Sequence, residues 1–163
     1  MVALWSYSIA LVGCRKDVAG PRGVLWEIGK PDAESGFDTN PADDPEVVEY
    51  KIGDPEDKFP EGLGTDIGKQ RSKIRIHFTG AIPMGTKLHV RWNPGGSGAV
   101  DQFKVELDSK PMGESPALPG TPPEKFRTDS FAVPASNATN HVLVFAHAQG
   151  DGLGLGHIRL EAE

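Results

Sequence analysis

Two short segments of the chain combine basic side chains with apolar residues at every second position. The segments are residues 73–78 and residues 88–92. If they pair as a hairpin, the outward positions bring Lys73 and four further polar side chains into one row. Those four, the candidate ligand-binding residues, are Arg75, His77, His89 and Arg91. Arginine holds a carboxylate through two parallel hydrogen bonds, so the row predicts binding of an acidic ligand.

The alternation also predicts how the two segments pair. With Ile76 opposite Val90, the inward side is wholly apolar, as a buried sheet face requires. The same register places Arg75 directly opposite Arg91, and two opposed arginines repel unless an anion lies between them. The alternative is a solvated sheet face on which the protein's own carboxylates form weak ion pairs with these residues. Those carboxylates come from Glu27, Glu106 and Glu161.

Metal binding is the other chemistry that these side chains suggest. His77 and His89 can supply two zinc ligands across a strand pair, but the sequence offers no third ligand at a suitable spacing. Calcium prefers hard oxygen ligands, which abound in residues 43–46, in residues 54–57 and around Asp151. The sequence therefore predicts no cofactor and no metal-ligating site residue, and it leaves a structural calcium ion open.

Short strands must position these residues. Apolar side chains alternate in eight runs bounded by Gly, Pro, Asn or Asp. The expected strands are residues 24–28, 47–52, 73–78, 88–92, 103–107, 130–133, 141–147 and 157–161. The proline-rich residues 110–125 are expected to be irregular. The predicted fold class is all-β, a jelly-roll β-sandwich of two antiparallel sheets joined by long loops.

Length and charge narrow the function classes. The 163 residues suit one domain, and the net charge of −6 lacks the cationic field that a nucleic-acid binder needs. No apolar run approaches the roughly 20 residues of a membrane-spanning helix. Glycine and proline interrupt almost every stretch, which disfavours a helical bundle. The expected partners therefore include no nucleic acid and no membrane span.

The N-terminal segment allows two interpretations. Residues 11–14 read Leu-Val-Gly-Cys, like a lipoprotein cleavage box, but no Lys or Arg precedes the apolar stretch. The alternative is a strand, since apolar and small residues alternate there. We expect residues 1–20 to be a leader or the tail of a preceding domain, and residues 21–163 to form the sandwich. Cys14 is the only cysteine, so no intramolecular disulfide forms.

Three segments resemble one known family. Residues 25–32 (Leu-Trp-Glu-Ile-Gly-Lys-Pro-Asp) look like the opening strand of the C-terminal module of rhamnogalacturonan lyases, polysaccharide lyase family four. Residues 50–55 (Tyr-Lys-Ile-Gly-Asp-Pro) resemble its next strand, and residues 156–161 (Gly-His-Ile-Arg-Leu-Glu) resemble its last. The order of the strands between them also fits. The chain departs from the family at Gly156 and His157, where the family has Asp-Tyr.

The resemblance implies a galactose-binding-like jelly roll that binds carbohydrate. In that family the catalytic residues lie in a separate domain, so the chain is expected not to be an enzyme. The expected ligand is a plant or algal polysaccharide, and an acidic, pectin-like polysaccharide is one candidate. The expected location is outside the cell or at its surface. The expected partner is an attached or separate catalytic domain. The alternative is a structural or protein-interaction β-sandwich of a secreted or surface lipoprotein, with no glycan ligand.

Two tryptophans could serve a sugar-binding module directly. Trp26 and Trp92 both stand at apolar-facing positions of expected strands. An exposed tryptophan can stack on a pyranose ring, whereas a buried one adds a large apolar area to the core. The alternation around both residues favours core packing.

Overall fold

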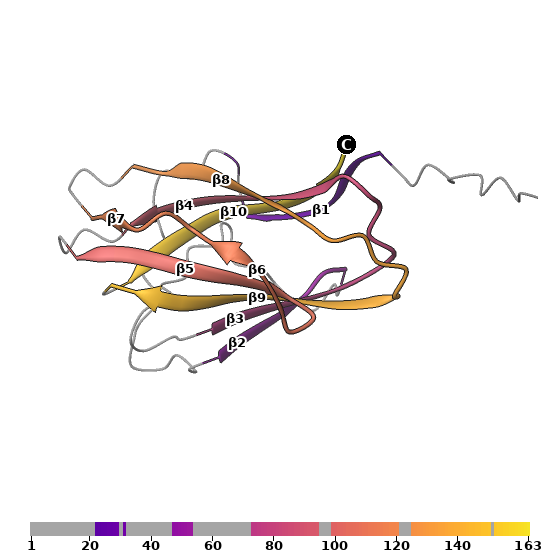
Figure 1. Ribbon diagram of the computed structural model, residues 1–163, viewed down its shortest axis with the longest axis horizontal. Helices are drawn as coiled ribbons and strands as arrows, with labels where there is room; N and C mark the ends of the chain where they lie inside the picture. The colour runs from indigo at the N-terminus through magenta and orange to yellow at the C-terminus, as the bar shows by residue number, and fades with distance from the viewer. Residues whose placement is uncertain are drawn as a thin grey trace, which may run out of the picture.

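Two layers of β-sheet face each other in the computed structural model (Figure 1). It describes residues 22–29, 31, 47–53, 73–94, 99–120, 125–150 and 152–163. These residues form ten strands and no helix, which confirms the predicted all-β sandwich. The expected N-terminal leader, the lipoprotein-like box and the domain boundary at residue 21 lie outside the described residues.

The first layer is a four-stranded antiparallel sheet. Its strands follow the order β1 (Gly23–Gly29), β10 (Leu153–Ala162), β4 (Thr86–Pro94) and β8 (Arg127–Ala132). β1 and β10 are the first and last described strands, yet they lie side by side. The pairing of β10 with β4 shifts between Leu155 and His157, so a β-bulge falls at Gly156.

The second layer is a six-stranded sheet. It contains β2 (Val47–Lys51), β3 (Lys73–Thr79), β9 (Asn140–Gln149), β5 (Val100–Leu107) and β6 (Lys110–Glu114), in that order. The short strand β7 (Leu118–Pro119) pairs with β5. The pairs are antiparallel apart from β2 with β3, which is parallel. The two-antiparallel-sheet architecture therefore carries one parallel pair at the β2 edge.

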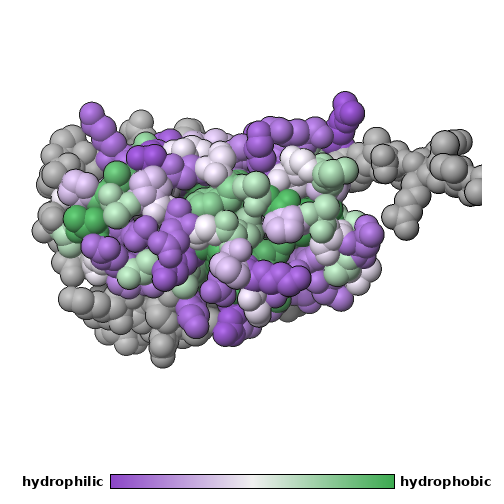
Figure 2. All heavy atoms as spheres, viewed as in Figure 1, coloured by the Kyte–Doolittle hydropathy of each residue, from purple (hydrophilic) through white to green (hydrophobic). Residues whose placement is uncertain are grey.

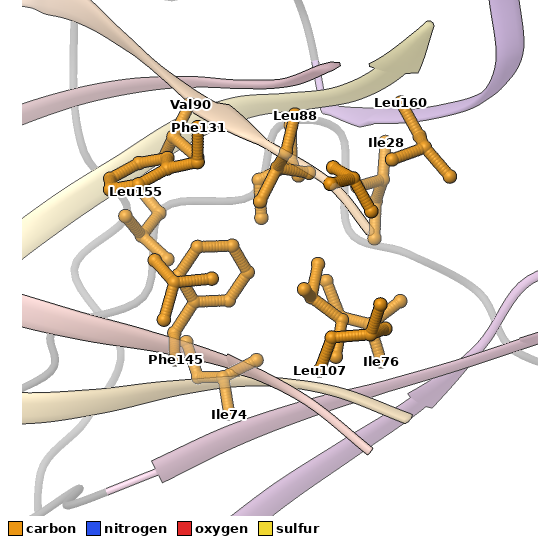
Figure 3. Packing of buried hydrophobic residues seen from close by; sticks show 14 of the residues in the cluster. Ile28, Ile74, Ile76, Leu88, Val90, Leu107, Phe131, Phe145, Leu155 and Leu160 are labelled. Carbon is orange, nitrogen blue, oxygen red and sulfur yellow. The ribbon is translucent and has the colours of Figure 1, made fainter. Parts of the chain in front are cut away.

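The core lies between the layers, where the inward side chains of both sheets meet (Figure 3). Alternate residues of a strand point to opposite faces, so one apolar set per strand is buried. Phe103 of β5 packs edge-on against Trp92 of β4, with ring centroids 5.2 Å apart. Trp26 is 8% exposed and Trp92 is fully buried, so both tryptophans pack in the core as predicted.

The outer surfaces are polar by contrast. Figure 2 shows hydrophilic residues along the rims of both layers, with apolar residues gathered in the band between them. The alternation thus assigned the inward faces of β3 and β4 correctly. Ile74 and Ile76 are buried, for example, while Arg75 between them is part-exposed.

The expected hairpin of β3 with β4 is wrong. β3 pairs with β2 and β9, whereas β4 pairs with β10 and β8, so the two strands belong to different layers. The connection between them crosses the sandwich, and Ile82 on it is buried and forms a β-bridge with Ser136. The alternation specifies which face of a strand is apolar and must be buried. It does not specify whether two such strands pair side by side in one sheet or face each other from two layers.

Residues 110–120, the part of the proline-rich segment that the structure describes up to its gap, are more regular than their prolines predict. Within them β6 pairs with β5 through a two-residue turn at Asp108 and Ser109, whose φ values are +50° and +64°. Positive φ at both central residues is the geometry of the turns that suit hairpins. β6 ends the order of its sheet, where a strand accepts proline because one side needs no hydrogen bonds.

Candidate ligand-binding site

A pocket of about 540 Å³ lies at one end of the six-stranded sheet. It is bordered by the end of β2, the end of β3 and the start of β9. Its lining includes Glu49, Tyr50, His77, Thr79 and Asn140. These residues come from both faces of the sheet, so the pocket wraps around the sheet end. Carboxylate, imidazole, hydroxyl and amide groups, and the ammonium group of Lys51, thus surround a surface that is otherwise mostly apolar.

The predicted site residues Arg75 and His77 lie on the outer face of this sheet, beside β2. The parallel register sets Glu49 next to Arg75, and Arg75 Nη1 donates a 2.8 Å hydrogen bond to Glu49 Oε1. The other carboxylate oxygen, Oε2, lies 3.7 Å from His77 Nε2. The hydrogen bond from Arg75 lowers the pKa of Glu49 below its usual value. Arg75 therefore orients the carboxylate, while His77 borders the pocket.

The predicted site residues His89 and Arg91 lie on the outer face of the other sheet. His89 Nδ1 is 2.8 Å from Ser130 Oγ on β8, and its Nε2 is 3.9 Å from Glu161 Oε2 on β10. The guanidinium carbon of Arg91 lies 5.0 Å from the centre of the Phe126 ring. This is the geometry of a cation–π contact, in which the ring face attracts the positive charge.

The four predicted residues therefore do not form one row. They divide into two pairs on opposite sides of the sandwich because β3 and β4 belong to different layers. Glu49 lies close to Arg75 and His77, and Glu161 lies close to His89. The sequence had named Glu161 as a counter-charge but not Glu49. Ligand binding by these residues stays a prediction.

Sequence reasoning missed much of the pocket. Tyr50 and Asn140 were not identified, because β2 was expected only as a strand and Asn140 lies at the start of another. His141 was noted only as a histidine, yet its side chain is completely buried beside the pocket. The signal was a histidine at an inward position of a strand, where an apolar residue is usual.

A hydrogen-bonded pair behind the pocket explains why His141 can be buried. Its Nδ1 lies 2.8 Å from Asp108 Oδ2, and its Nε2 lies 3.2 Å from the carbonyl oxygen of Ala138. Asp108 Oδ1 also accepts a 2.9 Å bond from the backbone N–H of Val142. Burial raises the pKa of Asp108, but the bonds from His141 and Val142 outweigh it and leave the pKa below its usual value. The pair ties the β5–β6 turn to the start of β9.

Metal ligation has no candidate in the part of the chain that the structure describes, where no three His, Cys, Asp or Glu residues cluster. His77 and His89 lie in different sheets and do not form the cross-strand zinc pair considered above. The acidic segments considered for calcium, residues 43–46, residues 54–57 and Asp151, are outside the described residues. The expectation that no cofactor is used stays a prediction. Among the described residues, no helix has the length and apolarity to cross a membrane.

No protein-family model matches the chain, and no curated protein matches it. Several solved structures resemble parts of it. One is BtGH115A, a family GH115 4-O-methyl-alpha-glucuronidase with specificity for decorated arabinogalactans. It is 15% identical with a TM-score of 0.42, over 61% of this chain and 14% of that one. Another is the C-terminal CBM6 of LamC, a marine laminarinase from Zobellia galactanivorans. It is 17% identical with a TM-score of 0.36, over 53% of this chain and 71% of that one.

A third structure, dimeric latent PorU from Porphyromonas gingivalis, has 11% identity and a TM-score of 0.42 over 60% of this chain and 10% of that one. The chain thus spans a small part of the glucuronidase and of PorU. These are distant, partial likenesses, and they assign the chain to no family. The resemblance to rhamnogalacturonan lyases, drawn from three sequence segments, stays a prediction.

Proposed function

We propose that the chain is a non-catalytic carbohydrate-binding module whose sugar site is the pocket beside β2, β3 and β9. The observation that supports this is the make-up of the pocket. Its apolar surface suits the face of a pyranose ring, and Thr79, Asn140 and His77 supply groups that hydrogen-bond to hydroxyls. Sites of this kind bind weakly one at a time, so attachment to a polymer benefits from several contacts at once.

The ligand class we propose is a plant or algal polysaccharide of the pectin-like kind, as the resemblance to rhamnogalacturonan lyases implies. The module would work without a cofactor, outside the cell or at its surface, and hold an attached or separate catalytic domain near its substrate. The competing proposal is a structural or protein-interaction domain with no glycan ligand. The 2.8 Å hydrogen bond between Arg75 and Glu49 favours this competing proposal. An ion pair of this kind is common on a solvated sheet face that binds no ligand.

Affinity electrophoresis in gels containing pectic polysaccharides tests the proposal, with NMR titration of neutral galacto-oligosaccharides to locate the site. We expect retardation in at least one gel and shifts at pocket residues. His77→Ala and Asn140→Ala should each weaken neutral-sugar binding about fivefold or more. His89→Ala removes an imidazole from the opposite sheet and should leave it unchanged. If no saccharide binds at millimolar concentration, the protein-interaction proposal replaces this one.

A further inference from the structure

The outer face of the four-stranded sheet carries a supported arginine. The aromatic ring of Phe126 lies beneath Arg91 and against the bulge of β10 at Gly156. A Cβ on Gly156 would lie 2.7 Å from the Phe126 ring, so the ring takes the space that any other residue would fill. β-Bulges often redirect side chains at binding sites. The bulge, the ring and the arginine therefore form one stacked unit.

A buried histidine lies next to this unit. His157 pairs across the strands with Arg91 and is two residues from Arg159 on β10. Its Nε2 is 3.4 Å from Glu27 Oε2, but the two atoms are poorly aligned. Within the described residues, this buried nitrogen therefore makes no hydrogen bond. Burial lowers the pKa of His157; Glu27 opposes this, and the charges of Arg159 and Arg91 lower it further. A neutral imidazole thus separates two cations.

The two arginines are diagonal neighbours across β4 and β10, because Arg91 lies opposite His157 and His89 lies opposite Arg159. Diagonal neighbours in an antiparallel pair are about 7–8 Å apart, a span that one oxyanion between two guanidinium groups can bridge. Arg159 Nη2 is 2.8 Å from Glu161 Oε1, while its buried Nε makes no hydrogen bond within the described residues. Glu27 is half-exposed and lies at the border of the same cluster.

We propose that this face is a second binding site, in which Arg91 and Arg159 hold a carboxylate or sulfate group of an acidic oligosaccharide. Two internal carboxylates compete with the ligand: Glu161, which is bonded to Arg159, and Glu27, which lies opposite Arg159 on β1. Hydroxyl groups of Thr128 and Ser130, opposite Arg91 and His89 on β8, are placed to contact the adjoining sugar. The inference rests on the proposed sugar-binding function and adds a ligand class and a separate location to it.

Calorimetric titration of the full chain with oligogalacturonate, a sulfated galactan oligosaccharide and a neutral galactan tests this site. Arg91→Ala and Arg159→Ala should each weaken binding of one or both acidic probes about tenfold, and Glu27→Gln should tighten it severalfold. Arg91→Lys keeps the charge but loses the planar fork, so it should recover little affinity. Comparing the two acidic probes shows whether the group held is a carboxylate or a sulfate.

Lys104→Ala, which removes an exposed cation paired with Glu114 on the opposite sheet, is the control and should bind both acidic probes like the unaltered protein. Circular dichroism confirms that each variant is folded. The second site is refuted if Arg91→Ala and Arg159→Ala bind acidic probes normally, or if polyglutamate binds as tightly as oligogalacturonate. If neutral galactan still binds in a His77-dependent way, the second site alone has failed. If neutral galactan does not bind either, the sugar-binding function itself has failed.

Discussion

The outer faces of the two sheets place similar side chains in opposite electrostatic settings. On the six-stranded sheet, Arg75 has Glu49 beside it on β2 and the apolar Val144 beside it on β9. On the four-stranded sheet, Arg91 has His157 on one side and Thr128 on the other. Arg75 is therefore bonded to a carboxylate of its neighbouring strand, whereas Arg91 is stacked on the Phe126 ring beside His157, with Arg159, Glu27 and Glu161 in the same group.

The difference shows that the neighbouring strand decides what an arginine can do. A guanidinium already bonded to a carboxylate, as Arg75 is to Glu49 and Arg159 is to Glu161, positions that carboxylate, and a ligand must displace it to bind. A guanidinium stacked on an aromatic ring is held in place while its edge remains directed at other partners. We therefore expect Arg75 on the six-stranded face to hold Glu49 in position, and Arg91 on the four-stranded face to bind an anion.

A cavity in the core between the two sheets should have the largest effect on stability. Phe103 contacts Trp92 from the four-stranded sheet and Phe145 from its own sheet, and it is fully buried. Phe103→Ala should lower the free energy of unfolding by about 3–5 kcal/mol, because it loses transfer energy and leaves a cavity. Chemical denaturation measures this, and Phe103→Leu should lose clearly less. Equal losses in the two variants would contradict the packing argument.

A change at the bulge should affect one face alone. Gly156→Ala places a Cβ 2.7 Å from the Phe126 ring, and the ring must move, which costs about 1–3 kcal/mol of stability. Arg91 then loses its support, so binding of an acidic probe should weaken while neutral-sugar binding in the pocket persists. Paired titrations of the variant with both probes measure the difference. Equal weakening of both would show that the two faces are not independent.

The sequence was sufficient for the strands and their faces but not for their partners. Alternating runs placed Ile74, Ile76 and Val90 correctly in the core, because a period of two is a local property of a pleated strand. The partner of each strand is a long-range property, so the register that joined Arg75 to Arg91 was wrong. The pocket depends on Asn140 and Tyr50, which come together only through the order of strands in the sheet.

Acid should lower the stability of the fold by protonating Asp108, which lies in the turn between β5 and β6 of the six-stranded sheet. The pKa of this carboxyl is lower in the folded protein than in the unfolded chain, so its charged form stabilises the fold above about pH 4. That contribution is lost as the pH falls through the folded value. Asp108→Asn keeps a residue that tolerates positive φ but removes the charge, and should cost about 1 kcal/mol after screening of this part-exposed group.

Urea unfolding of Asp108→Asn and the unaltered protein between pH 3 and pH 7 measures this contribution. The difference in stability should be largest at neutral pH and shrink toward pH 3, where the carboxyl of the unaltered protein gains its proton. Asp129→Asn is a useful comparison, since that carboxylate accepts from Trp92 and Arg127 on the other sheet. A difference that stays constant with pH would show that Asp108 acts through the shape of the turn and not its charge.

The smallest effect should come from Arg75, whose ion pair with Glu49 is exposed to solvent. Arg75→Ala removes an exposed ion pair with Glu49, and such pairs contribute little because solvent screens them and two side chains must be ordered. We therefore expect no resolvable change in the midpoint of urea unfolding. Glu49 loses the donor that lowers its pKa, so NMR titration of its carboxyl should show a rise. A clear loss of acidic-probe binding in this variant would reverse the comparison, because it would place the anion site on the six-stranded face.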